Sequence, residues 1–170
     1  MATCDASLCC RMRFLHIVIP VLLMGLLTDQ ASKSWASLRA AEPRILVPGY
    51  LAAYSVRNAG SLLGFGGDQA RTNTVFALLS MACATLLVRI AYAVRGQLRE
   101  ADCLAGALVL AGIFGNTVDR LALGYVRDFL VTWAIPTLAF NVADLLLVVG
   151  VASLFMARYR AGARVGQALA

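Results

Sequence analysis

Apolar residues fill four long stretches of the chain, and the polar positions gather between these stretches. Three uncharged runs lie at 14–28, 72–88 and 103–118, and a fourth run at 140–157 carries one charge, Asp144. A helix needs about 20 residues to cross the hydrocarbon core of a bilayer, and its ends extend into the interface. The pattern therefore predicts four transmembrane helices, which span approximately 14–31, 72–94, 103–120 and 138–157.

The composition agrees with a membrane protein. Hydrophobic residues make up 61% of the 170 residues and charged residues 14%, and the mean hydropathy is +0.78. This balance excludes an ordinary soluble domain. We expect a single membrane domain over 1–170, an all-α polytopic fold of four transmembrane helices with a small extracytoplasmic β-rich cap in the first outer loop. The expected partners include membrane lipids and no nucleic acid, and a monomer is the expected state.

The positive charges predict how the helices are oriented. Arginines crowd the N-terminal tail, the second loop and the C-terminal tail, at Arg11, Arg13, Arg95, Arg99, Arg158, Arg160 and Arg164. Cytoplasmic loops of membrane proteins carry an excess of Lys and Arg. Both termini are therefore expected in the cytoplasm. The first loop, 34–71, carries its arginines more thinly, so this loop and the third loop are expected to face outward.

The first outer loop has the pattern of a small β-rich cap. Residues 44–47 and 50–56 alternate in a way that allows short strands between turns. The sequence RNAGS at 57–61 offers a carboxamide and a permissive backbone that are able to hold a peptide. A simple turn is the alternative, and on these residues alone it is favoured.

The N-terminal part suggests two further readings, and both are disfavoured. A cleaved signal peptide would explain the arginines before the first apolar run, but DQASK at 29–33 follows in place of a small-residue cleavage site. A metal site on Cys4, Cys9 and Cys10 would lack histidine support, because His16 is the only histidine and lies in the first span. A zinc site of the His-Glu-x-x-His type is excluded. We expect no metal and no cofactor.

Carboxylates in and beside apolar segments are the strongest functional signal. Asp119, Asp128 and Asp144 follow one another through the last two predicted spans and the loop between them. An Asp at the centre of a spanning helix costs roughly 2.5 to 3.5 kcal/mol on insertion scales, so each is a candidate functional residue. In the orientation predicted above, all three gather at the outer surface.

A pair of carboxylates is the catalytic group that these residue types favour. A serine triad is disfavoured, because one histidine is present and the only lysine, Lys33, stands at the outer end of the first span. Two facing carboxylates share one proton, so that one acts as a base toward water and the other as an acid toward the carbonyl. Asp128 lies in a short polar break, and Asp144 lies about one turn inside the fourth span. These two residues are expected to meet.

The third carboxylate is expected to have a structural role. Asp119 lies three residues after Asn116, on the same helical face, and directly before Arg120. We expect it to hold Arg120 or a neighbouring helix end. For any single Asp, simple pairing with an arginine remains an open alternative.

Five ordered motifs together resemble the signal peptidase II family, the bacterial prolipoprotein signal peptidases, which are aspartic intramembrane proteases. The resemblance covers nearly the whole chain from the first span to the fourth. It is carried by DQASK at 29–33, RNAGS at 57–61, GNTVDR at 115–120, VRDF at 126–129 and FNVAD at 140–144.

The resemblance implies a catalytic dyad of Asp128 and Asp144, in the bacterial cytoplasmic (inner) membrane and near its outer surface. It implies a substrate-binding or site-supporting role for Asn58, Gly60, Asn116, Asp119, Arg120 and Asn141. The implied substrate is a prolipoprotein whose cysteine already carries diacylglycerol, cut on the N-terminal side of that cysteine. The chain departs from the family pattern at 111–114, at Ser61 and in Pro136, which lies farther from Phe140 than is typical. These departures affect loop shape and substrate preference more than the dyad.

Two other classes of membrane protein stay open at this point. A proton-coupled transporter also places Asp residues in its spans, but near the midplane and often in repeated halves. A structural membrane adaptor explains the spans and none of the polar motifs.

Overall fold

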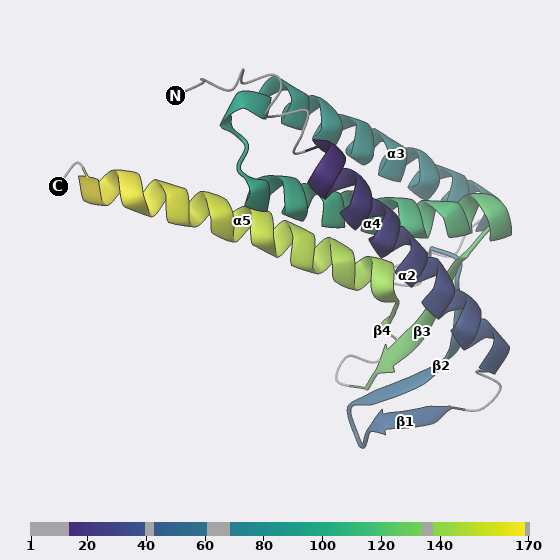
Figure 1. Ribbon diagram of the computed structural model, residues 1–170. Coiled ribbons are helices and arrows are strands. Elements are labelled where there is room, and N and C mark those ends of the chain that lie inside the picture. The colour runs from purple at the N-terminus through teal and green to yellow at the C-terminus, as the bar shows by residue number, and fades with distance from the viewer. Residues whose placement is uncertain (1–13, 40–42, 61–68, 134–137, 169–170) are drawn as a thin grey trace.

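The computed structural model describes residues 14–39, 43–60, 69–133 and 138–168. A π-helical segment, Phe14–Val18, opens the described chain. The long helices are α2 (Ile19–Arg39), α3 (Gln69–Ala93), α4 (Glu100–Leu123) and α5 (Val142–Ala168). The strands are β1 (Arg44–Val47), β2 (Leu51–Asn58), β3 (Val126–Thr132) and β4 (Leu138–Phe140). Figure 1 shows the helices extending away from the small sheet.

Within the described residues, three helices are long and apolar enough to cross a membrane. They are Ala70–Ala93, Glu100–Leu123 and Val142–Arg160. The first predicted span, 14–31, differs from them because its N-terminal part is the π-helical segment Phe14–Val18. The helix that follows, α2, carries Asp29 and Lys33 in its second half. The fold is therefore mostly helical, with three candidate membrane helices and a small antiparallel sheet.

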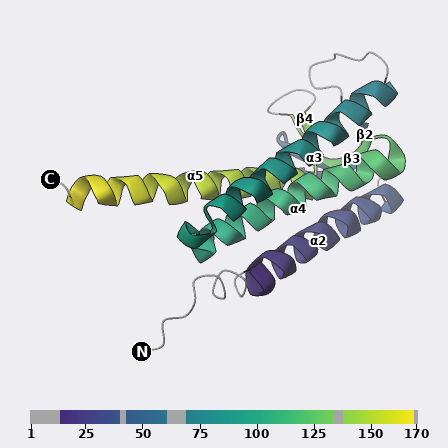
Figure 2. The ribbon, with the colours of Figure 1, turned by 90° about the horizontal axis from the view of Figure 1, so that it is seen from above.

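Helix α4 lies at the centre of the bundle and packs against α2, α3 and α5 (Figure 2). Small residues on α4 allow its neighbours to approach closely. A Cβ atom at Gly112 would collide with the backbone of Ala143 in α5, and one at Gly115 would collide with the carboxylate of Asp29 in α2. These two glycines therefore bring α2 and α5 close to the polar turn of α4 that carries Asn116 and Asp119.

The strands form one antiparallel sheet in the order β1-β2-β3-β4. The strand predicted at 44–47 is confirmed as β1, and the strand predicted at 50–56 corresponds to β2. The β-rich cap predicted in the first outer loop supplies two of the four strands, and the other two, β3 and β4, lie between α4 and α5. The predicted polar break at Asp128 is strand β3, where β-branched and aromatic neighbours such as Phe129 and Val131 are buried and favour a strand.

Two predicted boundaries also change. Residues 138–140, expected to begin the fourth span, form strand β4 and pair with Leu130, Val131 and Thr132 of β3, so that α5 begins only at Val142. Helix α2 continues to Arg39 and α3 begins at Gln69, which shortens the outer loop predicted at 34–71. The longer α2 is explained by Asp29 and Lys33, which are fully buried against the protein and need no contact with lipid.

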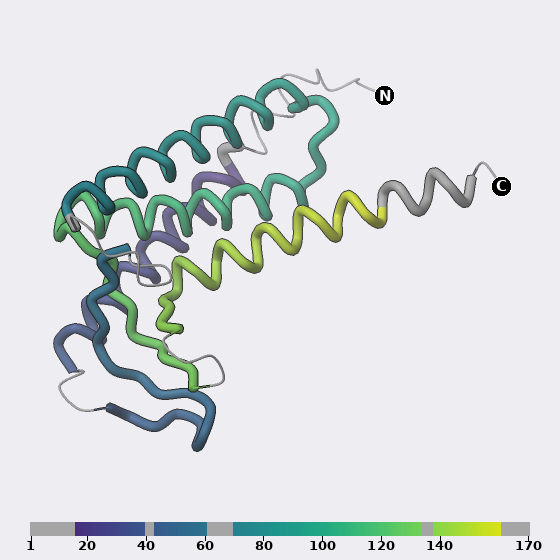
Figure 3. The backbone as a smooth tube through the Cα atoms, turned by 180° about the vertical axis from the view of Figure 1, so that it is seen from behind, coloured from purple at the N-terminus to yellow at the C-terminus, as the bar shows by residue number. Residues whose placement is uncertain are grey.

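The two ends of the bundle are built differently. The start of α2, the Arg95–Gln97 turn between α3 and α4, and the C-terminal part of α5 lie toward one end (Figures 1 and 3). The sheet lies at the opposite end, where α2 ends, α4 ends and α5 begins. The polar motifs at 115–120, 126–129 and 140–144 are therefore gathered beside the sheet.

Candidate active site

Asp128 is held on strand β3 and is only 1% exposed. Its strand pairs with β2, where Val56 lies opposite Asp128 and Asn58 lies opposite Val126. The Asn58 side chain donates a 2.8 Å hydrogen bond from Nδ2 to Asp128 Oδ2. The backbone N–H of Gly60, which has a φ of 86° that favours glycine, donates to Asn58 Oδ1 and fixes the direction of this carboxamide. Residues 57–60 therefore support Asp128 from the end of β2.

Asp144 is held at the first turn of helix α5. Its Oδ2 accepts a 3.1 Å hydrogen bond from the backbone N–H of Asn141, and Asn141 Oδ1 accepts one of 3.1 Å from the backbone N–H of Asp144. This reciprocal arrangement is a capping box, which satisfies unpaired donors at a helix start. The side chains of Asn141 and Asp144 therefore form part of the helix terminus itself.

Two carboxamides join the carboxylates into one network. Asn141 Nδ2 donates to Asp128 Oδ1 at 2.5 Å, while the backbone and Oδ1 of the same residue hold Asp144. Asn116 Nδ2 on α4 donates to Asp144 Oδ1 at 2.7 Å, and its Oδ1 accepts from Asn141 Nδ2 at 3.1 Å. The structure thus brings Asp128 and Asp144 together around Asn141, with each carboxylate oxygen facing a donor.

The environment favours a proton on the Asp128 carboxyl group. Burial raises its pKa from the ordinary value to about 6, and the nearby charge of Asp144 acts in the same direction. The hydrogen bonds from Asn58 and Asn141 oppose this change because they stabilise the ionised form. Burial is the largest effect. Asp128 therefore takes up its proton at a higher pH than an ordinary aspartate does.

Asp119 has a structural setting, but its partner is not the one expected. Asp119 Oδ1 forms a 2.7 Å ion pair with Arg127 Nη2, and Oδ2 accepts a 2.9 Å hydrogen bond from the Arg127 backbone. Lys33 Nζ lies 3.5 Å from Oδ2. In the described part of the chain, no hydrogen bond or salt bridge joins Asp119 to Arg120, so the Arg120 part of the expectation is wrong. Asp119 instead contacts Gln30 and Lys33 of the neighbouring helix α2. Residues 119 and 120 point in different directions on α4, and the start of β3 folds back over Asp119.

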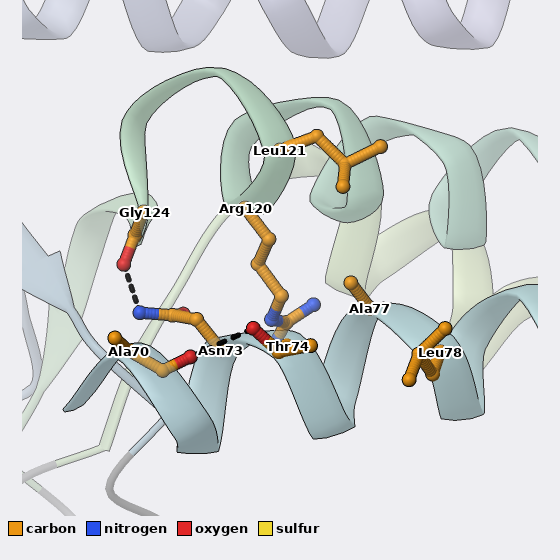
Figure 4. A pocket seen from close by; sticks show the side chains of 8 residues that line it. All are labelled: Ala70, Asn73, Thr74, Ala77, Leu78, Arg120, Leu121 and Gly124. Carbon is orange, nitrogen blue, oxygen red and sulfur yellow. Dashed lines mark hydrogen bonds between the residues drawn. The ribbon is translucent and has the colours of Figure 1, made fainter. Parts of the chain in front are cut away.

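Arg120 lines a pocket of about 710 Å³ between α3 and α4 (Figure 4). Its guanidinium lies over the Phe76 ring at 5.4 Å, and among the described residues its Nε has no hydrogen-bond partner. It interacts favourably with the charges of Asp144, Asp128 and Asp119. The other residues of the pocket wall are mostly apolar or small: Ala70, Asn73, Thr74, Ala77, Leu78, Leu121 and Gly124.

The sequence reasoning assigned no role to several residues that complete this network. Asp29 Oδ1 accepts a 2.8 Å hydrogen bond from the backbone N–H of Ala143, next to Asp144. Lys33, Gln30 and Arg127 connect the same region through α2 and β3. The spacing of Asp29 and Lys33 could have indicated a role for these two residues, because they form an i, i+4 acid–base pair at the end of an apolar run.

Metal ligands do not gather in the part of the chain that the structure describes. Within it, no group of three or more His, Cys, Asp or Glu side chains is arranged to hold a metal ion. Cys4, Cys9 and Cys10 lie outside the described residues, as do Ser61 and Pro136.

Relatives among solved structures share this fold. A bacterial membrane enzyme solved by the in meso method at 2.3 Å has a TM-score of 0.70 and 25% identity, over 84% of this chain and 87% of that chain. A second, solved at 1.9 Å, has a TM-score of 0.69 and 24% identity over 82% and 90%.

Curated relatives are similar in sequence. A lipoprotein signal peptidase of Polynucleobacter necessarius is 30% identical over 153 residues, which cover 88% of this chain and 90% of that protein. One of Enterococcus faecalis is 32% identical over 151 residues, covering 86% and 88%. A relative of that name from Anaeromyxobacter is 39% identical, but the match spans about half (51%) of its length.

The family model described as signal peptidase (SPase) II matches residues 21–160 and includes every motif of the network described above. This protein therefore belongs to the signal peptidase II family.

Proposed function

We propose that this protein is a membrane-embedded aspartic endopeptidase that removes the signal peptide from diacylglyceryl-modified prolipoproteins. Family membership makes it a bacterial integral membrane protease that cleaves signal peptides from prolipoproteins. The proposal adds the aspartic catalytic type, the lipid on the substrate cysteine and a cut on the N-terminal side of that cysteine. Asp128 and Asp144 are the catalytic residues of this proposal.

The observation that carries the proposal is that one residue, Asn141, donates hydrogen bonds to both carboxylates. Asn141 donates to Asp128 through Nδ2 and to Asp144 through its backbone N–H. A close pair of carboxylates does not readily ionise twice, so it holds one proton. The ionised member takes a proton from water as the water attacks the scissile carbonyl, and the protonated member donates to that carbonyl oxygen. The proton taken from water then passes to the leaving amine as the C–N bond breaks. The other carboxylate takes a proton back from a hydroxyl of the diol as the carbonyl re-forms, so that the pair again holds one proton.

The proposed substrate fits the surroundings of the pair. Asp144 is partly exposed, in contrast to Asp128, so a peptide and water are expected to approach from its side. Arg120 lines a pocket whose wall includes Ala77, Leu78 and Leu121, and its buried Nε has no hydrogen-bond partner among the residues that the structure describes. We infer that a peptide carbonyl binds the guanidinium while an acyl chain lies against the apolar wall. The proposed substrate, a peptide next to a lipid, matches this combination.

The membrane arrangement completes the proposal. We infer that α2 with the preceding segment Phe14–Val18 forms a fourth span, so that residues 1–170 make one membrane domain. The arginines of the Arg95–Gln97 turn and of α5 lie at the end opposite the sheet. By the positive-inside rule, this end faces the cytoplasm, and the dyad lies near the outer surface. The protein is proposed to act as a monomer, without nucleic acid.

The proposal is tested with purified protein and a prolipoprotein carrying diacylglyceryl cysteine. We expect release of the signal peptide, with the modified cysteine at the new N-terminus by mass spectrometry. A substrate with unmodified cysteine is the matched control and should be cleaved far more slowly. Chelators should leave the rate unchanged. Cleavage that is lost in a chelator and restored by a divalent cation would contradict the aspartic type.

The orientation needs a separate test. A reporter fused after Ala170 should be active only in the version that requires the cytoplasm, and a Gly66→Cys variant should be labelled from outside. Both results follow from the distribution of arginines. Labelling at position 66 from the cytoplasmic side alone would overturn the proposed topology.

A further inference from the structure

Lys33 is the only lysine of the chain, and it is fully buried. Its Nζ lies 2.8 Å from Asp29 Oδ2 and 2.9 Å from Asn116 Oδ1. The carbonyl oxygen of Gly115 and Oδ2 of Asp119 lie farther away, at 3.4 and 3.5 Å. An ammonium group has three donors. The two short contacts show that it serves both an ion pair and an uncharged amide.

An ion pair alone does not account for this placement. Removing a lysine from water is costly, and a pair with Asp29 repays the cost only when further hydrogen bonds satisfy both groups. Asp29 is satisfied by the backbone N–H of Ala143 as well as by Lys33. The remaining short contact of Lys33 is directed to Asn116, the residue that donates to Asp144.

The direction of the Asn116 carboxamide follows from its neighbours. Lys33 Nζ and Asn141 Nδ2 donate hydrogen bonds and accept none. The atom of Asn116 that faces them must therefore be an acceptor, which is its Oδ1. Its nitrogen must then face Asp144. A hydrogen bond from a cation is stronger than a neutral one, and it polarises the amide so that the N–H on the other side becomes a better donor.

We propose, as an extension of the proposed function, that Lys33 is a positioning residue of the dyad. Its ammonium fixes and polarises the Asn116 carboxamide, which in turn holds the Asp144 carboxylate in the orientation that catalysis requires. Lys33 itself does not touch the substrate, and its effect on the reaction passes through Asn116.

The charges around Lys33 determine how its removal should change the pH at which Asp128 ionises. It is faced by Asp29 of its own helix and by Asp119 of α4, and Asp119 is in turn paired with Arg127 of β3. Beyond Asn116 lie the dyad residues, with Arg120 close to both. The charge of Lys33 lowers the pKa of Asp128. Loss of that charge should therefore move the ionisation of Asp128 to higher pH.

The test compares Lys33→Met with the double variant Lys33→Met/Asp29→Asn. The single change leaves Asp29 as an unpaired buried charge, so it is expected to fold poorly. The double change removes both charges, and the amide oxygen at position 29 still accepts from Ala143. We expect the double variant to fold, while its kcat falls by about 10- to 100-fold with little change in KM. The alkaline limb of its kcat/KM profile should move to higher pH.

Because Lys33 is the only lysine, labelling lysine with ¹⁵N gives one side-chain ammonium signal. The chemical shift of that signal should change in Asn116→Ala. In the unaltered protein, it should also change with pH as the carboxyl groups of the dyad ionise. In Asn116→Ala, the dependence on the dyad should disappear. An unchanged signal in Asn116→Ala would show that Lys33 and Asn116 are not coupled, and it would overturn the inference even if the Lys33 variants failed to fold.

The unaltered enzyme separates this inference from the proposed function. If it does not cleave the lipidated substrate, the proposed function fails. If it cleaves, and the folded double variant keeps the full kcat and the same pH profile, only the positioning role of Lys33 is wrong.

Discussion

Buried carboxylates stand at both ends of the α4–α5 pair. Asp102 and Asp144 each accept a hydrogen bond from a backbone N–H at a helix start, but the side chains that hold the carboxylates differ between the two ends. At the end away from the sheet, Asp102 is 4% exposed and lies 3.6 Å from both Arg99 and Arg158, whose side chains are about half exposed. At the sheet end, Asp128 and Asp144 accept side-chain hydrogen bonds from Asn58, Asn116 and Asn141 at 2.5 to 2.8 Å.

The difference concerns orientation more than charge. An exposed arginine on a long side chain follows its carboxylate when the carboxylate moves, and water screens the pair. A planar carboxamide that is fixed by its own partners allows one direction only. Asn58 is fixed by Gly60, Asn141 by the Asp144 backbone, and Asn116 by Lys33. The contacts at the end away from the sheet therefore serve to hold α4 and α5 together. Those at the sheet end fix the orientation of the carboxylates, which suits a site where atoms must be placed accurately.

The largest effect is expected from changing the dyad itself. Asp128→Asn and Asp144→Asn preserve size but remove the proton exchange that both carboxyl groups share. Each should lower cleavage by at least about 10²- to 10⁴-fold, the usual contribution of acid–base catalysis. Signal-peptide release is measured per molecule of folded protein in the membrane. Near-normal turnover by either variant would contradict the assignment of Asp128 and Asp144 as the catalytic residues.

Asp119→Asn should act mainly on stability. Asp119 is 1% exposed and pairs with Arg127, so its loss leaves a partly buried cation without its partner. We expect the free energy of unfolding to fall by about 3 kcal/mol, with a lower folded yield, while folded molecules keep cleaving. Thermal unfolding and a rate per folded molecule measure the two effects. A variant that folds normally and is wholly inactive would give Asp119 a catalytic role.

The pH dependence of cleavage should be bell-shaped. Below its pKa of about 6, Asp128 holds a proton and can act as the acid, and above that value the pair becomes doubly ionised. We expect kcat/KM, which reports the free enzyme, to fall as the pH rises through about 6. The alkaline limb of kcat should lie higher, because bound substrate excludes water and favours the proton further. A flat profile from pH 5 to 8 would speak against a shared proton.

The smallest effect is expected at the other end. Asp102→Asn replaces a carboxylate whose ion pairs are partly exposed to solvent. The free energy of unfolding should fall by about 1 kcal/mol or less, and the rate of cleavage should stay unchanged. Urea unfolding and the cleavage assay together test this expectation. A loss of activity comparable to that of the dyad variants would show that Asp102, like the dyad, is needed for cleavage, and it would contradict the proposed difference between the two ends.

Some parts of this arrangement are accessible from sequence because they depend on local spacing. The i, i+3 relation of Asn141 and Asp144 gives the capping box, and the uncharged runs give the helices of α3, α4 and α5. The pairing of Asp119 with Arg127 was not predicted, since it requires the chain to turn back after α4. Likewise, strand β3 pairs with β2 across about 70 residues, and a single sequence offers no signal for that register.

Synthesis from the N-terminus brings the two dyad carboxylates together only late. Asp128 depends on Asn58, a partner 70 positions earlier, whereas Asp144 depends on the start of the last helix. A nascent chain that ends with α4 still lacks Asp144 and also Asn141, the residue that donates to both carboxylates. If the pair is catalytic as proposed, proteolytic activity is expected to appear only after α5 has been synthesised and has packed against α4.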